Sequence, residues 1–149
     1  MNYEQLAERL LPGEYPDLAS FETRYPPRDL PKGAQVTRLA PSPTGFIHLG
    51  NLFVAIANER IAHQSGGKLF LRIEDTDLKR KVDGAVEAVI AALDYFDIRF
   101  DEGAEIGGDD TYAPWYQRQR AEIYRAYAKD LIRCGRAYPC FCTEEELAA

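Results

Sequence analysis

The chain has 149 residues, of which 46% are hydrophobic and 28% charged, and its formal net charge is −6. This composition is typical of a globular protein and excludes a disordered one. The net negative charge argues against a general nucleic-acid coat, which needs excess Lys and Arg. No run of about 18 apolar residues is present, so no membrane-spanning helix is expected. Three cysteines predict no disulfide framework and favour a reducing, cytoplasmic location.

Charge is distributed unevenly along the chain. Residues 34–81 contain seven basic and four acidic residues, whereas residues 82–149 contain seven basic and fourteen acidic ones. A basic segment inside an acidic chain is typical of an anion-binding region, although solvated faces show the same pattern.

The first 33 residues form a Pro-rich N-terminal extension. They hold five of the nine prolines, which disfavour helix at and before their own positions. We expect a short helix over residues 3–11 and an extended, packed arm after it, without chemistry of its own.

From residue 35 the sequence alternates between strand and helix patterns. The expected strands are residues 35–40, 68–73 and 137–141. The expected helices begin at His48, near Val82, at Tyr116 and at Thr143, with an acidic loop over residues 98–112 and Gly135 closing the third helix. This order predicts an α/β fold, a Rossmann-like parallel sheet with flanking helices. Three strands are few for such a sheet, so we expect an incomplete domain from a longer protein, the alternative being a small complete domain.

The junction between the first strand and the first long helix, residues 38–51, is the expected ligand site. Ligands of open α/β sheets bind at the carboxyl ends of the strands, and a helix N-terminus suits phosphate. The junction lacks a G-x-G-x-x-G fingerprint, and Gly66-Gly67-Lys68 is not a P-loop, because Leu69 follows the lysine. His48 can hydrogen-bond a phosphate, and Gly50 allows a nucleoside to approach the backbone.

The sequence His48-Leu49-Gly50-Asn51 resembles the first signature motif of the class I aminoacyl-tRNA synthetases, with Asn51 in place of its last histidine. Residues 37–45 resemble the glutamyl form of this motif, and residues 66–77, 116–120 and 138–143 are similar to further blocks of that family. The resemblance covers residues 35–149, and residues 1–33 resemble an extension found in one bacterial subgroup. It implies that residues 34–136 are the first half of a Rossmann-like catalytic domain. Residues 137–149 would begin an inserted acceptor-binding region.

The resemblance implies a role for each matching residue. Arg38 would bind the side-chain carboxylate of glutamate, and Glu74 its α-ammonium, while Ala40 and Ser42 would line the pocket. The implied ATP-binding residues are Pro41, Thr44, Gly45, His48, Gly50 and Asn51, of which His48 and Gly50 are the catalytic motif. Asp77 and Arg80 would contact the tRNA acceptor end. Structural alternatives stay open: Arg38 and Glu74 can form a plain salt bridge, and residues 79–81 can be a solvated charge run.

The implied function is ATP-dependent activation of L-glutamate to glutamyl-adenylate and its transfer to tRNA(Glu), with Mg2+ accompanying ATP. A cytoplasmic monomer without membrane association is expected. The second ATP motif of the family is absent from the sequence, so these residues alone are expected to be inactive. The alternatives are a glutamyl-queuosine tRNA(Asp) synthetase and a non-catalytic binding module derived from a synthetase.

The cysteines and the second histidine receive separate expectations. Cys140 and Cys142 are at most half of a four-ligand zinc site, so zinc is expected only in a longer protein. Cys134 is expected to be buried in the third helix, and His63 to be structural or solvated and without a partner.

Overall fold

The computed structural model describes residues 2–43, 47–77, 79–80 and 82–148. Two compact units are present, one of residues 24–121 and one of residues 1–23 together with 122–149. The division predicted above, at residues 33 and 136, stays a prediction.

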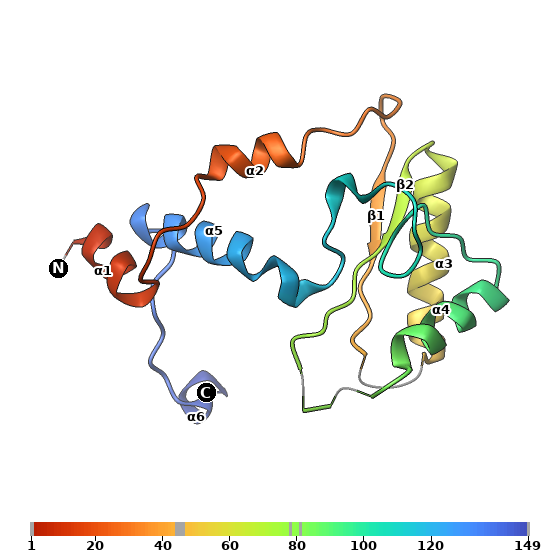
Figure 1. The fold of residues 1–149 in the computed structure, drawn as a ribbon. Coiled ribbons are helices and arrows are strands. Elements are labelled where there is room, and N and C mark those ends of the chain that lie inside the picture. The colour runs from red at the N-terminus through yellow and green to blue at the C-terminus, as the bar shows by residue number, and fades with distance from the viewer. Residues whose placement is uncertain (1, 44–46, 78, 81, 149) are drawn as a thin grey trace. The chain divides into compact units, whose positions relative to one another are not determined.

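Residues 24–121 form a three-stranded parallel sheet in the order β1-β2-β3, of which Figure 1 shows β1 and β2 side by side. The strands are β1 (Val36–Leu39), β2 (Lys68–Leu71) and β3 (Glu102–Gly103). The register pairs Val36 with Lys68 and Leu39 with Leu71. The predicted α/β fold with a parallel sheet is confirmed, and so are its first two strands.

The third strand was predicted wrongly. Residues 137–141 form no strand, and β3 lies instead inside the segment predicted to be an acidic loop. It was missed because Glu102-Gly103 has no apolar alternation. Gly103 has a φ of 139°, and a Cβ there would lie 2.5 Å from the Leu71 carbonyl oxygen, so only glycine fits against β2.

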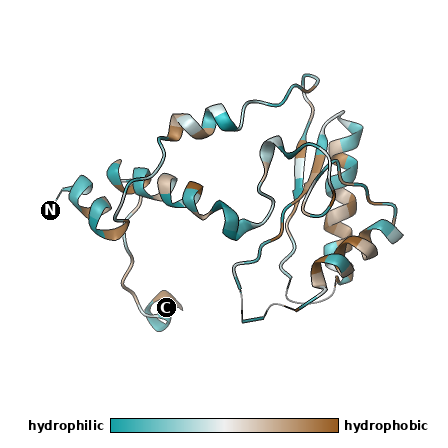
Figure 2. Cartoon of the chain, viewed as in Figure 1, coloured by the Kyte–Doolittle hydropathy of each residue, from teal (hydrophilic) through white to brown (hydrophobic). Residues whose placement is uncertain are grey.

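Two helices cover one face of this sheet. Side chains alternate along a strand, so Thr37, Leu39 and Leu71 share a face, and the Thr37 hydroxyl donates to the Asn58 carbonyl of α3 (Leu49–Gln64; 2.8 Å). α4 (Ala85–Tyr95) completes the core, and Figure 2 shows hydrophobic residues along much of both helices. The buried core consists of Leu39, Ala55, Ala62, Leu69, Leu71, Ile73, Val89, Leu93, Ile98, Ala104 and Trp115.

The side of α3 that faces the sheet is formed by small residues. Leu49 and Phe53 are 80% and 72% exposed, whereas the small residues Ala55 and Ala62 are fully buried. Small side chains let the helix axis approach the strands closely, and Leu52 packs partly buried against the same core. Hydrophobic spacing located this helix correctly but does not show which of its side chains are buried.

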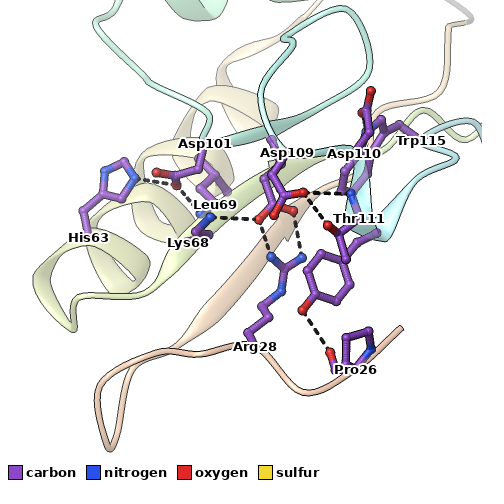
Figure 3. A network of polar contacts seen from close by, with 12 residues as sticks. Pro26, Arg28, His63, Lys68, Leu69, Asp101, Asp109, Asp110, Thr111 and Trp115 are labelled. Atoms are coloured by element: carbon purple, nitrogen blue, oxygen red, sulfur yellow. Dashed lines mark hydrogen bonds and ion pairs between the residues drawn. The ribbon is translucent and has the colours of Figure 1, made fainter. Parts of the chain in front are cut away.

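A buried carboxylate joins the strand edge to the segment before β1 (Figure 3). Glu102 is fully buried and forms a two-point ion pair with Arg28, in which Nη2 lies 2.8 Å from Oε2. Lys68 Nζ lies 3.3 Å from the same carboxylate, and the Arg28 guanidinium lies 3.6 Å from the centre of the Tyr112 ring. Two cations and an aromatic face compensate the charge that burial would otherwise penalise.

His63 bridges α3 to the loop before β3, contrary to the expectation that it has no partner. Its Nδ1 lies 2.8 Å from Glu59, and its Nε2 lies 3.0 Å from an Asp101 oxygen that also accepts the Leu69 N–H (Figure 3). Asp101 could not be predicted as a partner because it is 38 residues away in sequence, whereas Glu59 lies four residues before His63 on the same helix and was a local signal that went unused. Hydrogen bonding to Asp101 and Glu59 raises the pKa of His63.

The other unit is helical. It contains α1 (Tyr3–Leu10), α2 (Leu18–Arg24), α5 (Ala121–Arg133) and α6 (Glu144–Ala148). The last residue of α2 and the first residue of α5 are assigned to the first unit. α1 is confirmed, whereas α2 replaces the predicted extended arm, because no proline falls between Pro16 and Tyr25. The predicted third helix begins later than expected, since residues 117–120 form a 3-10 turn before α5.

Buried charge holds the N-terminal helix to α5 within this unit. Lys129 is 3% exposed, and its Nζ donates to the Gly13 carbonyl (2.7 Å) and pairs with Glu8 (2.8 Å). Arg133 pairs with Glu4 at 3.0 Å. The segment predicted to be a packed extension therefore packs on α5.

The end of α5 and the start of α6 follow the sequence signals, with one exception. Gly135 ends α5 with a φ of 69°, and Thr143 and Glu146 form the predicted capping box. Cys134 was expected to be buried, but it is exposed because it follows the last turn of α5. Among the described residues, none of the helices has both the length and the apolar character needed to cross a membrane.

Replacing Glu102 with Gln should destabilise the protein by about 3 kcal/mol, because it leaves the largely buried Arg28 and the partly exposed Lys68 without their counter-charge. Chemical denaturation followed by circular dichroism measures the change in unfolding free energy. Asp97→Asn is the matched control, since its ion pair with Arg99 is exposed and should contribute less than about 1 kcal/mol. Equal effects of the two substitutions would contradict the compensating role of Arg28 and Lys68.

The raised pKa of His63 predicts a pH-dependent stability. Protonated His63 is stabilised in the folded state, so its contribution is complete below the unfolded-state pKa of about 6.5 and is lost as pH rises through the higher folded-state pKa. Thermal unfolding from pH 5.5 to 8.5 should therefore show a loss of stability that is smaller in His63→Gln. An identical pH profile for the two proteins would contradict the bridge.

Candidate active site

The pairing of β1 with β2 continues past the ends of both strands. The Arg72 N–H donates to the Leu39 carbonyl and the Glu74 N–H to the Pro41 carbonyl, each at 3.0 Å. Alternation therefore places a defined set of side chains on the sheet face opposite α3. These residues are Arg38, Ala40 and Ser42 along the first strand and Phe70, Arg72 and Glu74 along the second.

Arg38 and Glu74 form an ion pair across this face. Arg38 Nη2 lies 3.5 Å from Glu74 Oε1, and the two side chains are 37% and 36% exposed. This ion pair is the plain salt bridge that the sequence left open as an alternative to substrate binding. An ion pair with this exposure and distance contributes little to stability, so a ligand with a carboxylate and an ammonium can replace it at small cost.

His48 begins α3 and orders the first turn of the helix. Its Nδ1 accepts the Gly50 N–H (3.1 Å), and its own backbone N–H donates to Asn51 Oδ1 (3.2 Å). In the neutral ring this arrangement assigns the proton to Nε2, which is left as a donor. A Cβ at Gly50 would lie 3.0 Å from His48 Cε1, so the glycine allows the ring to lie over the helix N-terminus.

A cavity of about 280 Å³ lies between the end of the first strand and the start of α3. Its lining residues are Arg38, Leu39, Ala40, Pro41, Ile47, Asn51 and Val54. Four residues predicted to bind glutamate or ATP thus line one cavity, while the lining does not include Ser42, His48, Gly50 or Glu74. Thr44 and Gly45, predicted to bind ATP, lie outside the described residues.

Comparison with known proteins identifies the family. The model of the class I tRNA synthetases (E and Q), catalytic domain, matches residues 35–149. The chain belongs to this family. It is 57% identical over 149 residues to the glutamate–tRNA ligase of Acetivibrio thermocellus, covering 99% of this chain and 27% of the relative. It is 52% identical over 151 residues to that of Clostridium perfringens strain 13, covering 100% and 28%.

Solved synthetase structures share the fold. The glutamate–tRNA synthetase of Elizabethkingia anophelis superposes with a TM-score of 0.67 at 40% identity, covering 77% of this chain and 23% of that one. The glutamate–tRNA ligase of Elizabethkingia meningosepticum, solved in complex with its amino acid, gives 0.65 at 41% identity, covering 76% and 22%. The Rossmann-like fold of a class I synthetase catalytic domain is thereby confirmed. The chain spans about 27% of the length of the curated relatives it matches.

The two residues predicted to contact tRNA bind each other in this synthetase chain. Arg80 Nε lies 2.6 Å from Asp77 Oδ2, and Asp77 also accepts the backbone N–H groups of Lys79 and Arg80 at 3.2 Å. The hydrogen bond from Arg80 lowers the pKa of Asp77. The ion pair therefore fixes the Asp77 and Arg80 side chains against each other, and their contact with tRNA stays a prediction.

The cysteine pair does not complete a metal site within the described part of the chain. Cys140 and Cys142 are exposed, and no group of three or more His, Cys, Asp or Glu side chains gathers there in a metal-binding arrangement. Hydrogen bonds from Cys142 lower the pKa of the Cys140 thiol. Two thiols fit half of a tetrahedral zinc site, and zinc in a longer protein stays a prediction.

Two further residues near the strand ends were missed by sequence reasoning. Arg72 lies between Phe70 and Glu74 on the sheet face opposite α3. The alternation of side chains along the β2 sequence was enough to predict that position. Tyr116 pairs with Ile73 at the other edge of β2 and donates to Glu105 (2.8 Å), and burial raises its pKa to about 12. No short-range pattern predicts that pairing, because the two segments are far apart in sequence.

Gly50→Ala should displace the His48 ring and break the hydrogen bond to its Nδ1. Nitrogen-15 NMR of the imidazole at a pH where the ring is neutral measures the tautomer directly. The wild-type chain should show the Nε2–H form, and the variant should show a mixture of the two tautomers. Ala57→Gly within α3 is the control. Gly107→Ala would not serve, because Gly107 has a φ of 76° and an alanine there would be strained. An unchanged tautomer in Gly50→Ala would contradict the proposed packing.

Proposed function

We propose that the protein containing this chain activates L-glutamate with ATP and transfers the glutamyl group to tRNA(Glu). The observation that best supports this function is the shared sheet face of Arg38 and Glu74, in a family whose relatives above are glutamate–tRNA ligases. The reaction joins the α-carboxylate of glutamate to the α-phosphate of ATP and releases pyrophosphate. The terminal adenosine of tRNA then attacks the glutamyl-adenylate and releases AMP.

Glutamate binding follows from the charges on that face. The planar guanidinium of Arg38 suits the side-chain carboxylate of the substrate. Glu74, at the outer end of the face, suits the α-ammonium group. Ala40 is small and leaves room for the substrate methylenes, and the Ser42 hydroxyl can hydrogen-bond a polar group. Binding exchanges the 3.5 Å ion pair of Arg38 and Glu74 for two ion pairs with the ligand.

ATP binding at the start of α3 would stabilise the developing charge. The unpaired N–H groups and positive dipole end of a helix N-terminus suit the phosphates, and the free Nε2 donor of His48 suits the α-phosphate. Pro41, Gly50 and Asn51 complete this part of the proposal. No covalent nucleophile of the protein is needed, because positioning and charge stabilisation suffice for phosphoryl chemistry. A magnesium ion bound with ATP would neutralise phosphate charge.

The macromolecular side of the proposal rests on the family. Asp77 and Arg80 are proposed to contact the tRNA acceptor end, and the protein is proposed to be a cytoplasmic monomer.

Arg38 favours a carboxylate over an amide side chain, which disfavours glutamine as the substrate. The relatives described above are glutamate–tRNA ligases, which favours charging of tRNA(Glu) over attachment of glutamate to queuosine.

Arg38→Ala should weaken binding of a glutamyl-adenylate analogue, glutamyl-sulfamoyl-adenosine, by at least about tenfold, because a charge-assisted hydrogen bond to the carboxylate is lost. Isothermal titration calorimetry on the full-length protein that contains this chain measures the affinity. Arg99→Ala, an exposed arginine that pairs only with Asp97 among the described residues, should bind as the wild type does. No binding by the wild type, or equal binding by Arg38→Ala, would contradict the pocket.

A further inference from the structure

We propose that residues 25–28 of the N-terminal extension (the strap) are a positioning element for Glu74. The proposal rests on the function proposed above, in which Glu74 binds the α-ammonium group of glutamate. The strap lies outside residues 35–149, which the family model matches, so no family motif covers it. Residues 112–118 connect the strap to Glu74, because they bind both the strap and the two neighbours of Glu74 in sequence.

Residues 112–118 form hydrogen bonds with the residue before Glu74. The Ile73 N–H donates to the Trp115 carbonyl and the Gln117 N–H to the Ile73 carbonyl, each at 2.9 Å. This parallel bridge lies at the edge of β2 that does not pair with β1. Both hydrogen-bonding groups of the Ile73 backbone are therefore used, which fixes the chain that leads into Glu74.

The residue after Glu74 is bound by the same segment. The Arg118 N–H donates to Asp75 Oδ1 at 2.9 Å. The Glu74 side chain itself has one ion pair within the part of the chain that the structure describes, with Arg38 at 3.5 Å. A single long ion pair orients a carboxylate weakly, so the backbone held by residues 112–118 decides where the Glu74 carboxylate lies.

The strap binds the start of this segment through two tyrosine hydroxyl groups. The Tyr25 hydroxyl donates to the Ala113 carbonyl (3.1 Å), and the Tyr112 hydroxyl donates to the Pro26 carbonyl (2.9 Å; Figure 3). Each segment thus supplies one donor and one acceptor. The partners are 88 and 86 residues apart in sequence, so these hydrogen bonds belong to the tertiary structure.

Two arginines hold the tyrosine rings in place. The Arg28 guanidinium lies 3.6 Å from the centre of the Tyr112 ring and also pairs with the buried Glu102. The Arg120 guanidinium lies 5.1 Å from the centre of the Tyr25 ring, and its Nη1 donates to the Tyr112 carbonyl (3.1 Å). Cations against both rings restrict their orientation, and the hydroxyl groups are directed at their acceptors.

The strap can therefore affect the ammonium end of the substrate without contacting the substrate. Loss of its two hydrogen bonds would loosen residues 112–118 and allow the Glu74 carboxylate to shift. Arg38 is held by the register of β1 with β2, and His48 by the first turn of α3, so neither depends on the strap. We expect recognition of the ammonium group to weaken while the remaining contacts with the ligand persist.

The test removes both hydroxyl groups and keeps both rings, in the full-length protein that contains this chain. Titration calorimetry compares glutamyl-sulfamoyl-adenosine with glutaryl-sulfamoyl-adenosine, which lacks only the α-ammonium group. The double variant Tyr25→Phe/Tyr112→Phe should weaken the glutamyl probe about three- to tenfold and the glutaryl probe less than about twofold, because only the glutamyl probe has an ammonium group for Glu74.

Two further variants make the comparison specific. In a Glu74→Gln background, the double tyrosine substitution should weaken the glutamyl probe no further, because both changes act on the same contact. Tyr15→Phe is the matched control, since it removes another tyrosine hydroxyl of the extension, one that donates to the Pro12 carbonyl (3.4 Å) in the helical unit. It should leave both affinities unchanged.

Each outcome decides a separate point. Equal weakening of the two probes by the double variant would assign the strap a purely structural role and overturn the inference. Unchanged affinities, or full additivity with Glu74→Gln, would overturn it too. Failure of the wild-type protein to bind the glutamyl probe would overturn the proposed function and the inference with it. If thermal unfolding shows that the double variant is not folded, Tyr25→Phe alone decides: selective weakening of the glutamyl probe supports the inference, and equal or absent weakening overturns it.

Discussion

The parallel pairing of β1 with β2 is the constraint on which the site depends. Its register aligns Arg38 with Phe70, and hydrogen bonds beyond the strand ends extend the same alignment to Glu74. Alternate side chains of the two strands therefore lie on opposite faces of the sheet. Leu39, Leu69 and Leu71 enter the core beneath α3, and the charged residues face the other way. A slip of one residue in either strand would move its charges into the core, so burial of the leucines holds the site in place.

Charged side chains are compensated to different degrees at two places in the unit of residues 24–121. Near β3, Glu102 is fully buried and compensated by Arg28 and Lys68, an arrangement that stabilises the fold. On the sheet face opposite α3, Arg38 forms a long and partly exposed ion pair, and the buried Nε of Arg72 has no hydrogen-bond partner in the part of the chain that the structure describes. Incomplete compensation is unfavourable for stability but useful for a ligand that supplies the missing charges.

Local signals predicted the elements that depend on neighbours in sequence. The helix beginning at His48, the helix end at Gly135 and the capping box at Thr143 all follow from residues within one turn. Apolar spacing was less reliable where packing distance decides. In α3 the buried positions are Ala55 and Ala62, because the helix lies close to the strands, whereas Leu49 and Phe53 are exposed.

The sequence by itself determined the α/β class, the first two strands, the junction at residues 38–51 and the resemblance to the glutamyl-type synthetases. Those features depend on short motifs and on alternation along a single segment. Only the tertiary structure decided that β3 joins the sheet, that Asp101 binds His63, that Glu102 is buried between two cations and that Arg72 shares a face with Arg38 and Glu74. Each of these contacts joins segments far apart in the chain, and such pairings depend on register and burial, which no local pattern specifies.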